Sequence, residues 1–208
     1  MILIYHIAHI DRLASILDAG FLYSDAEAHR QNVNGTVIGM QHIKDRRLGK
    51  PIECFNGLNV GDCVPFYFCP RSVMLYILYK GNHPDVSYDG GERPILHLEF
   101  DAMSVKQWAD SEGLRVAFSD RNAGSATAEF RSEMSALQSL NWSAINADDW
   151  RGCMEEKQAE FLVERRVPIS LLTRIGVKDA DVQQNVWRVM RKAGMGNVPV
   201  EVLREWYY

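Results

Sequence analysis

The feature that most constrains this chain is a glutamate at the start of a short apolar segment. In residues 159–164, aromatic and β-branched side chains follow Glu160 without interruption, which is typical of a strand covered on both faces. Burying an unpaired carboxylate costs several kcal/mol, so Glu160 must be paired with a cation or act on a ligand. An ordinary ion pair with Arg165 or Arg166 would satisfy it, and this segment alone does not decide between the two interpretations.

The chain has 208 residues, enough for one large domain, and its apolar share of 47% is ample for a core. No internal repeat, low-complexity tract or linker divides the sequence, so we expect a single domain over residues 1–208. The formal net charge of −4 argues against a globally basic nucleic-acid binder. A polyanionic partner would therefore have to bind a local basic patch.

No segment has the roughly 18 unbroken apolar residues of a membrane span, and residues 1–6 lack the charged start and cleavage site of a signal peptide. The sequence therefore predicts a soluble, cytoplasmic protein with no membrane partner. The cysteines form neither a CxxC pair nor a zinc-like cluster with histidine, which favours reduced thiols and no metal site. They are Cys54, Cys63, Cys69 and Cys153.

The first 50 residues predict two helices, with a strand before them and a loop between them. Residues 2–7 are apolar except for His6 and predict an opening strand, which leads into the first helix. Residues 24–36 show little periodicity and many small or polar residues, so we expect a mobile surface loop that could close over a ligand. Residues 39–49 predict a short helix, which forms, together with Lys50, the most basic patch in this half of the chain.

Beyond residue 50, changes in periodicity predict alternating strands and helices. Residues 60–69 are rich in aromatic and β-branched side chains and end at Pro70, as a strand does at a turn. Residues 71–80 then switch to helical spacing, with Ser72 as a possible N-cap. Further strands are predicted at residues 95–100, 115–118, 160–163, 175–177 and 199–203, and further helices at residues 101–109, 129–140, 147–156 and 181–192. The aromatic residues 205–208 are expected to pack on the body of the protein.

Several familiar nucleotide and hydrolase motifs do not occur in this sequence. It contains no GxGxxG after a strand, no GxxxxGK[ST], no HExxH and no GxSxG. Rossmann, P-loop, zincin and hydrolase-elbow interpretations therefore have no local support. A nucleotide, if bound, must be held in another way.

One set of residues spans the chain nearly end to end in a characteristic order. His6 on the first strand, Tyr67 at the end of a strand and Glu160 before an apolar strand are similar to the His-Tyr-Glu arrangement of the diphtheria-toxin and poly(ADP-ribose) polymerase class of ADP-ribosyltransferases. More specific strings occur at residues 4–7 with 9–11, 46–47, 64–72 with 74–76, 94–98, 156–163 and 206–208. Together they resemble the DarT family, toxins of bacterial toxin–antitoxin pairs that ADP-ribosylate bases in single-stranded DNA.

This resemblance implies a fold, a co-substrate, an acceptor and a partner. The fold class would be α/β (α+β), an ADP-ribosyltransferase-type split antiparallel β core with peripheral helices. NAD+ would be the co-substrate, single-stranded DNA the acceptor and a DarG-like antitoxin the protein partner. By the same resemblance, the catalytic residues would be Glu160 and Arg47, and the residues that contact NAD+ would be His6, Ala8, Tyr67, Ser72, Tyr76 and Arg47.

The chemistry of such a site explains these residue types. Positive charge develops at C1′ when the bond between nicotinamide and ribose breaks, and a carboxylate bonded to the 2′-hydroxyl stabilises it, a role that the resemblance gives to Glu160. His6 would donate a hydrogen bond to a ribose hydroxyl, although a core histidine bonded to a backbone carbonyl is the simpler alternative for that residue alone. Tyr67 and Tyr76 would flank the nicotinamide ring, or would be ordinary core aromatics.

The resemblance places the family's catalytic arginine at Arg47. A neutral thymine N3 or guanine amino group is a poor nucleophile, so a cation beside the base or the NAD+ phosphate would favour loss of a proton from the base. Arginine stays protonated in proteins, which argues against a literal general base and favours electrostatic positioning by Arg47. The alternative for Arg46 and Arg47 is a solvated helix face.

The DNA would have to reach C1′ as an unpaired strand, because base pairing hides N3. The predicted groove contains Lys44, Arg46 and Lys50 from the basic helix, with Arg121 and Asn122 from a later polar loop. Members of the family can carry histidine at the position of Asn122, so the base stays open, with thymine preferred to guanine. Two alternatives remain: an enzyme of the same class that modifies RNA or protein, and a non-catalytic nucleic-acid-binding module.

Overall fold

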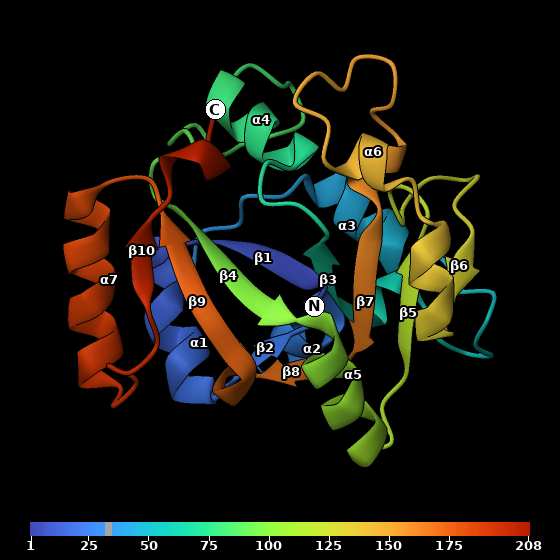
Figure 1. The fold of residues 1–208 in the computed structure, drawn as a ribbon, viewed down its shortest axis with the longest axis horizontal. Helices are drawn as coiled ribbons and strands as arrows, with labels where there is room; N and C mark the ends of the chain where they lie inside the picture. The colour runs from blue at the N-terminus through green and yellow to red at the C-terminus, as the bar shows by residue number, and fades with distance from the viewer. Residues whose placement is uncertain (32–34) are drawn as a thin grey trace.

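An eight-stranded sheet forms the centre of the computed structural model, which describes residues 1–31 and 35–208 (Figure 1). The strand order is β10-β9-β4-β1-β3-β7-β5-β6, and every neighbouring pair is antiparallel except β9 and β10. β2 and β8 form a separate two-stranded sheet. The strands are β1 (Leu3–His9), β2 (Phe21–Tyr23), β3 (Cys63–Tyr67), β4 (Ile95–Asp101), β5 (Val116–Ser119), β6 (Phe130–Arg131), β7 (Glu160–Glu164), β8 (Arg166–Pro168), β9 (Leu172–Val177) and β10 (Val200–Val202).

Peripheral helices cover this sheet. α1 (Leu13–Ala19) and α7 (Ala180–Lys192) pack against each other beside β9 and β10, whereas α3 (Gln41–Leu48) and α6 (Trp142–Ile145) lie near β3 and β7 (Figure 1). The other helices are α2 (Asp25–Arg30), α4 (Val73–Lys80) and α5 (Ala102–Ser111). The predicted fold class, a mixed fold with a mostly antiparallel core and peripheral helices, is confirmed. Within the described part of the chain, no helix is long and apolar enough to cross a membrane.

The sheet is split between β1 and β3. β1 follows β4 along its whole length, but its only register pair with β3 is Tyr5 with Tyr67. Pro65 explains the break, because a proline has no N–H to donate to a neighbouring strand. Its carbonyl oxygen instead bonds to Nδ1 of His6 at 2.9 Å. A side chain of β1 thus takes the place of a backbone ladder bond at the split.

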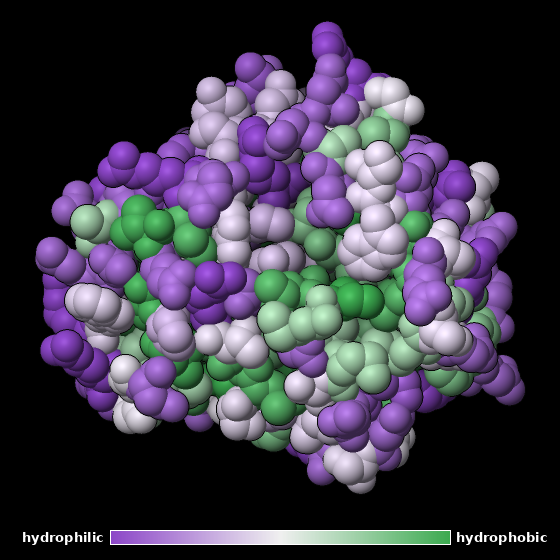
Figure 2. All heavy atoms as spheres, viewed as in Figure 1, coloured by the Kyte–Doolittle hydropathy of each residue, from purple (hydrophilic) through white to green (hydrophobic). Residues whose placement is uncertain are grey.

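The burial of their residues shows which strands lie in the interior of the sheet. β7 is buried along Glu160–Val163, between β3 and β5, and six of the seven β4 residues are buried. Figure 2 shows hydrophobic residues across the middle of one face, near the N-terminus and the start of α5, with hydrophilic residues around the rim. Met1 and Met103 contribute exposed apolar surface. Glu160 is therefore a carboxylate on an interior strand, not one at the edge of the sheet.

Local sequence signals place several helix ends correctly. The side chains of Ser72 and Asp101 accept backbone hydrogen bonds at the N-termini of α4 and α5. Gly20 ends α1 with φ 72°, in the left-handed region that favours glycine. The C-terminal residues pack on the body as predicted, since Trp206 and Tyr207 are buried and the Tyr207 hydroxyl donates to the Ile95 carbonyl at 2.7 Å.

The predicted loop at residues 24–36 is wrong in part. Six of its residues form α2, because Ser24 Oγ accepts from Glu27 N and provides the N-cap. Residues 32–34 lie outside the described residues.

Two predicted helices are also wrong. Residues 147–156 contain no α-helix, since Asp149 accepts hydrogen bonds from the backbone and guanidinium of Arg151, and such local bonds compete with helix formation. Residues 129–140 form β6, which pairs with β5, and a 3-10 helix at Met134–Ser139. Pairing with a neighbouring strand here overrides local propensity.

Candidate active site

The split in the sheet brings three predicted residues into one region. His6 lies on β1, Tyr67 ends β3, and Glu160 begins β7. Tyr67 is the register partner of Tyr5 on one side and of Glu160 on the other. The strand pairing alone therefore places an imidazole, a phenol and a carboxylate from distant parts of the sequence close together.

Glu160 is held by a bidentate ion pair with Arg47. Arg47 Nη1 donates to Oε1 at 3.0 Å and Nη2 donates to Oε2 at 2.7 Å, across 113 residues of sequence. The backbone N–H of Ala123 also donates to Oε1 at 2.9 Å. The side chains of Glu160 and Arg47 are 3% and 12% exposed, so the pair is largely removed from water. Parallel N–H···O bonds of this kind fix orientation as well as charge.

The alternative partners of Glu160 are excluded by the structure. Arg165 Nε lies 3.8 Å from Glu27, and Arg166 Nη2 lies 3.4 Å from Glu112. The partner is Arg47, which the sequence pattern alone could not identify. The alternative of a solvated helix face is thus excluded for Arg47, whereas Arg46 is exposed.

Arg47 is charged and Tyr67 is neutral near neutral pH. Burial alone would lower the pKa of Arg47, but the adjacent Glu160 carboxylate outweighs that effect and raises it above the usual value. Burial, followed by the charge of Glu160, raises the pKa of Tyr67, which therefore remains a phenol. Arg47 cannot act as a general base here, as expected from its chemistry.

His6 is a neutral imidazole, and among residues 1–31 and 35–208 its Nε2 has no hydrogen-bond partner. Burial lowers its pKa to about 4, against a smaller opposing effect of the bond to Pro65. In the neutral ring Nδ1 must carry the proton, because it bonds to a carbonyl oxygen. Nε2 is then an acceptor, so the expectation that His6 donates a hydrogen bond to a ribose hydroxyl is corrected. The imidazole can accept one instead.

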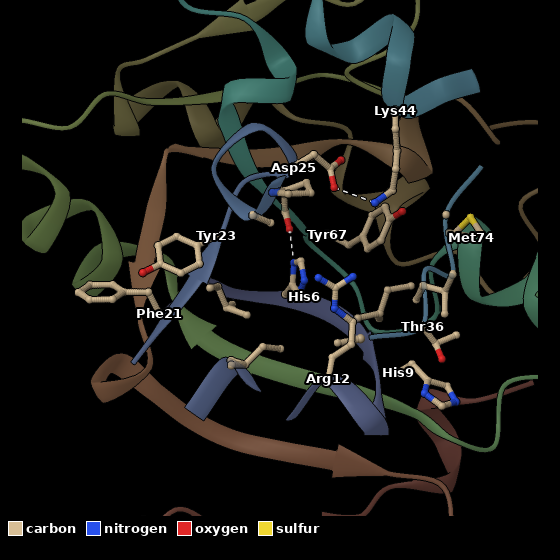
Figure 3. Close-up of a pocket in the computed structure, with 18 residues that line it drawn as sticks. His6, His9, Arg12, Phe21, Tyr23, Asp25, Thr36, Lys44, Tyr67 and Met74 are labelled. Atoms are coloured by element: carbon tan, nitrogen blue, oxygen red, sulfur yellow. Dashed lines mark hydrogen bonds and ion pairs between the residues drawn. The ribbon is translucent and has the colours of Figure 1, made fainter. Parts of the chain in front are cut away.

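Two adjoining hollows open beside these residues. The first, of about 170 Å³, is lined by the C-terminal part of β1 and by β2 and α2 (Figure 3). The second, of about 640 Å³, is lined by residues of α3 and α4. The residues that line both are Asp25, Gly39, Lys44, Pro65, Tyr67 and Met74. The two hollows therefore meet beside Tyr67 and together offer an elongated site.

The residues predicted to contact NAD+ lie mainly in these hollows. His6, Ala8 and Tyr67 line the first hollow. Arg47, Tyr67 and Tyr76 line the second, where the Tyr76 ring packs edge-on against Trp150 at 5.3 Å. Ser72 differs from the others, because it is fully buried and its Oγ accepts from Leu75 N as the cap of α4.

The basic helix α3 joins the second hollow to the polar loop at residues 119–125. Lys44 lines both hollows and is paired with Asp25 at 2.7 Å. Lys50 Nζ donates to the Ser125 carbonyl at 2.6 Å. The loop and the helix are in contact at Gly124, where a Cβ would lie 3.0 Å from Asn122 Oδ1 and 3.4 Å from Arg46 Nη2. Arg46 has no carboxylate within ion-pair distance in residues 1–31 and 35–208.

The two loop residues predicted to bind DNA differ in their availability. Arg121 is paired with Asp120 at 3.0 Å and with Glu155 at 3.6 Å, so its charge is compensated within the protein. Asn122 lines the second hollow and donates to Gln158 Oε1 at 3.1 Å. The structure thus brings Asn122, but not a free Arg121 charge, to the Glu160 site.

Sequence reasoning missed several residues of this site. Arg12 and Asp25 line the first hollow, and Gln158 lines the second. Arg12 could have been suspected from its place directly after the first strand, but no sequence signal marks the others. Among the described residues, no group of three or more histidine, cysteine, aspartate or glutamate side chains could hold a metal ion.

Comparison with known proteins gives one consistent family. The sequence model of the family described as "DarT: ssDNA thymidine ADP-ribosyltransferase, DarT" matches residues 5–208. A protein of Thermus sp. (strain 2.9), named DNA ADP-ribosyl transferase, is 38% identical over 99% of this chain and 95% of its own length. A fusion of a DNA ADP-ribosyl transferase with a DNA ADP-ribosyl glycohydrolase from Thermosipho africanus is 27% identical over 95% of this chain, which spans 47% of the fusion.

Solved structures show the same similarity. Thermus sp. 2.9 DarT in complex with ADP-ribosylated ssDNA superposes with a TM-score of 0.89 and 36% identity, over 100% of this chain and 96% of that one. The same protein in complex with NAD+ superposes with a TM-score of 0.82 and 34% identity, over 100% and 98%. The similarity therefore extends over the whole chain.

Proposed function

Because the chain belongs to the DarT family of single-stranded DNA thymidine ADP-ribosyltransferases, we propose that it transfers ADP-ribose from NAD+ to thymine in single-stranded DNA, with Glu160 and Arg47 as its catalytic pair. The observation that carries this proposal is the buried bidentate pair of these two side chains, whose arginine lines the second hollow. We further propose that residues 1–208 act as one domain and that the reaction takes place in the cytoplasm, where DNA is present.

The hollows suit NAD+ in shape and chemistry. NAD+ supplies the activated bond between nicotinamide and C1′ of its ribose. Nε2 of His6 can accept a hydrogen bond from a ribose hydroxyl, and the aromatic side chains of Tyr67 and Tyr76 can orient a planar ring. Ala8 contributes a small side chain that leaves room in the first hollow. Ser72 supports this site indirectly, because it caps the helix that carries Tyr76.

The geometry leaves Glu160 able to take one more hydrogen bond. Oε1 already accepts two, from Arg47 and Ala123, whereas Oε2 accepts one, from Arg47. A carboxylate oxygen has two lone pairs, so Oε2 retains an acceptor site. We propose that this site receives the 2′-hydroxyl of the nicotinamide ribose. The negative charge then lies beside C1′, where positive charge develops as the bond breaks.

Arg47 supports the reaction without taking a proton. Its pKa is raised, so it stays a cation throughout. The transfer breaks the bond from C1′ to nicotinamide, forms a bond from C1′ to a base nitrogen and releases a proton from that nitrogen. A fixed cation beside the base lowers the cost of that proton loss and orients Glu160 at the same time.

The DNA strand is proposed to approach along α3 and the 119–125 loop. Arg46 is the exposed cation of this surface that has no ion-pair partner among the described residues. Lys50, which follows α3, donates a hydrogen bond to the Ser125 carbonyl and so connects the helix with the loop. Asn122 would contact the strand where it enters the second hollow. Lys44 faces the NAD+ side and is paired with Asp25, so its contribution to DNA is smaller. Arg121, already compensated, mainly positions the loop.

A DarG-like antitoxin is the proposed protein partner. The resemblance to toxin–antitoxin pairs supports it, and so does the relative in which a DNA ADP-ribosyl transferase is fused to a DNA ADP-ribosyl glycohydrolase. A glycohydrolase would remove the modification that this enzyme adds. Co-expression with such a protein should suppress growth arrest caused by this chain.

Acceptor identity is tested by incubating the protein with NAD+ and oligonucleotides that differ in one base. Fragmentation of the product by mass spectrometry should place one ADP-ribose on thymine in single-stranded DNA. Matched RNA and protein acceptors serve as controls. Modification of guanine, RNA or protein instead, with thymine unmodified, would overturn the proposed acceptor while leaving the NAD+ site intact.

A further inference from the structure

Arg12 is a partly buried guanidinium that has no counter-ion in the described part of the chain. It ends the 3-10 helix Ile10–Arg12 that follows β1, and it lines the first hollow. No acidic side chain of residues 1–31 and 35–208 lies within ion-pair distance of it. The other arginines without such a partner there are all exposed, namely Arg46, Arg188, Arg191 and Arg204. A cation that is partly removed from water without a partner is costly unless a ligand supplies the negative charge.

The aliphatic part of the Arg12 side chain is held so that the guanidinium lies in the first hollow. Gly35 packs directly on it, because a Cβ at Gly35 would lie 2.4 Å from Arg12 Cγ, and the φ of Gly35 is 138°. The neighbouring Thr36 is tied down by Asp11, which accepts from its N–H at 3.2 Å and from its hydroxyl at 2.5 Å. Figure 3 shows the guanidinium of Arg12 beside the ring of His6, inside the hollow. The position is therefore preorganised.

The first hollow carries an excess of positive charge. Its charged lining consists of Arg12, Lys44 and Asp25, two cations and one carboxylate. The carboxylate is already used, because Asp25 pairs with Lys44 at 2.7 Å. His6 adds no charge at neutral pH. The unbalanced charge is that of Arg12, so the hollow favours an anionic ligand group.

We propose that Arg12 binds the diphosphate of the NAD+ co-substrate, an assignment that rests on the proposed function. A planar guanidinium matches two phosphate oxygens at once, which a lysine cannot do. The contact is remote from C1′ and is the same before and during bond breakage, so it contributes uniform binding. Arg12 is accordingly a binding residue, not a catalytic one.

The test compares ligands with and without the diphosphate. Arg12→Met removes the charge but keeps an unbranched stem under Gly35. We expect its affinity for ADP to fall at least about tenfold, because the diphosphate loses its hydrogen bonds to a charged group, while its affinity for adenosine stays unchanged. Arg12→Lys should be intermediate, and Arg188→Met, an exposed arginine on α7, should bind like wild type. Unchanged ADP binding by Arg12→Met, or an equal loss for adenosine, overturns the assignment.

Two further measurements distinguish a wrong assignment of Arg12 from a variant that fails to fold and from a wrong proposed function. In the wild-type protein, ADP but not adenosine should protect Arg12 from modification by phenylglyoxal, as measured by peptide mass spectrometry, with Arg188 as the unprotected reference. Binding of ADP without this protection contradicts the assignment. The KM for NAD+ of Arg12→Met should rise while kcat stays within about twofold. If wild type binds ADP through Arg12 but modifies no DNA, the proposed function fails and the anion site stands.

Discussion

Removing Arg47 should destabilise the whole protein, because it leaves a carboxylate buried in the sheet. Arg47→Met deletes both guanidinium donors to Glu160, whose side chain is only 3% exposed. One hydrogen bond, from the backbone of Ala123, then remains. Breaking a buried ion pair by removing one partner costs about 3–5 kcal/mol. Native proteins of this size are stable by only about 5–15 kcal/mol, so the loss is a large fraction of the total.

The double variant shows whether the loss comes from the uncompensated charge. Arg47→Met with Glu160→Gln removes the cation and the anion together, so its cost should be smaller than that of Arg47→Met alone. The coupling energy of the cycle should then be about 2 kcal/mol or more. Arg115→Met provides a matched comparison, since Arg115 pairs with Glu164 at the other end of β7, where the two side chains are 32% and 16% exposed. The loss there should be smaller.

Urea unfolding of these variants at pH 7, followed by tryptophan fluorescence, measures the free energies directly. The expected order of stability is wild type, then Arg115→Met, then Arg47→Met, with the double variant above Arg47→Met. A loss below about 1 kcal/mol for Arg47→Met, or a double variant whose cost equals the sum of the single costs, would refute the reasoning.

Three further predictions concern the pH dependence of stability, the binding of DNA and the aromatic ring of Tyr67. Burial lowers the pKa of His97 to about 4, so the unfolded state binds more protons than the folded state between about pH 6.5 and 4. As the pH falls over that range, His97 alone should lower the unfolding free energy by up to about 3 kcal/mol, in addition to the loss from His6, whose pKa is also lowered to about 4. Urea titrations should therefore show a shallower fall for His97→Gln. Arg46→Ala should weaken single-stranded DNA binding and reduce its salt slope by about 0.7, as measured by fluorescence anisotropy, with NAD+ binding unchanged; an unchanged slope contradicts the DNA path. The Tyr67→Phe variant should cleave NAD+ and release nicotinamide faster than the Tyr67→Ala variant, because it keeps the aromatic ring. Equal rates of nicotinamide release would contradict a packing role for this ring.

Strands and caps were predictable because their signals are local. The apolar run after Glu160, the cap at Ser72 and the stop at Gly20 each depend on a few neighbouring residues. Residues 147–156 show the limit of such signals. There Asp149 and Arg151 satisfy each other locally, and the helix that composition suggested does not form.

The candidate site residues could be proposed from the sequence only through the family resemblance. The sequence alone shows that Glu160 needs a partner, but the two nearest arginines pair elsewhere and the true partner lies 113 residues away. That contact depends on how α3 lies against the end of β7, which no periodicity encodes. Arg12 was missed for the same reason, since its importance comes from the absence of a counter-ion, which is a property of the fold.

The most direct test of the account compares two glutamates at opposite ends of β7. Glu160→Gln and Glu164→Gln make the same change on one strand, at residues that are each paired with an arginine. The measurement is the rate of ADP-ribose transfer from NAD+ to a thymine-containing single-stranded oligonucleotide. Glu160→Gln should lose about three orders of magnitude or more, whereas Glu164→Gln should stay within a few fold of wild type. Equal rates for the two variants, or full activity of Glu160→Gln, would contradict the proposed role of this carboxylate.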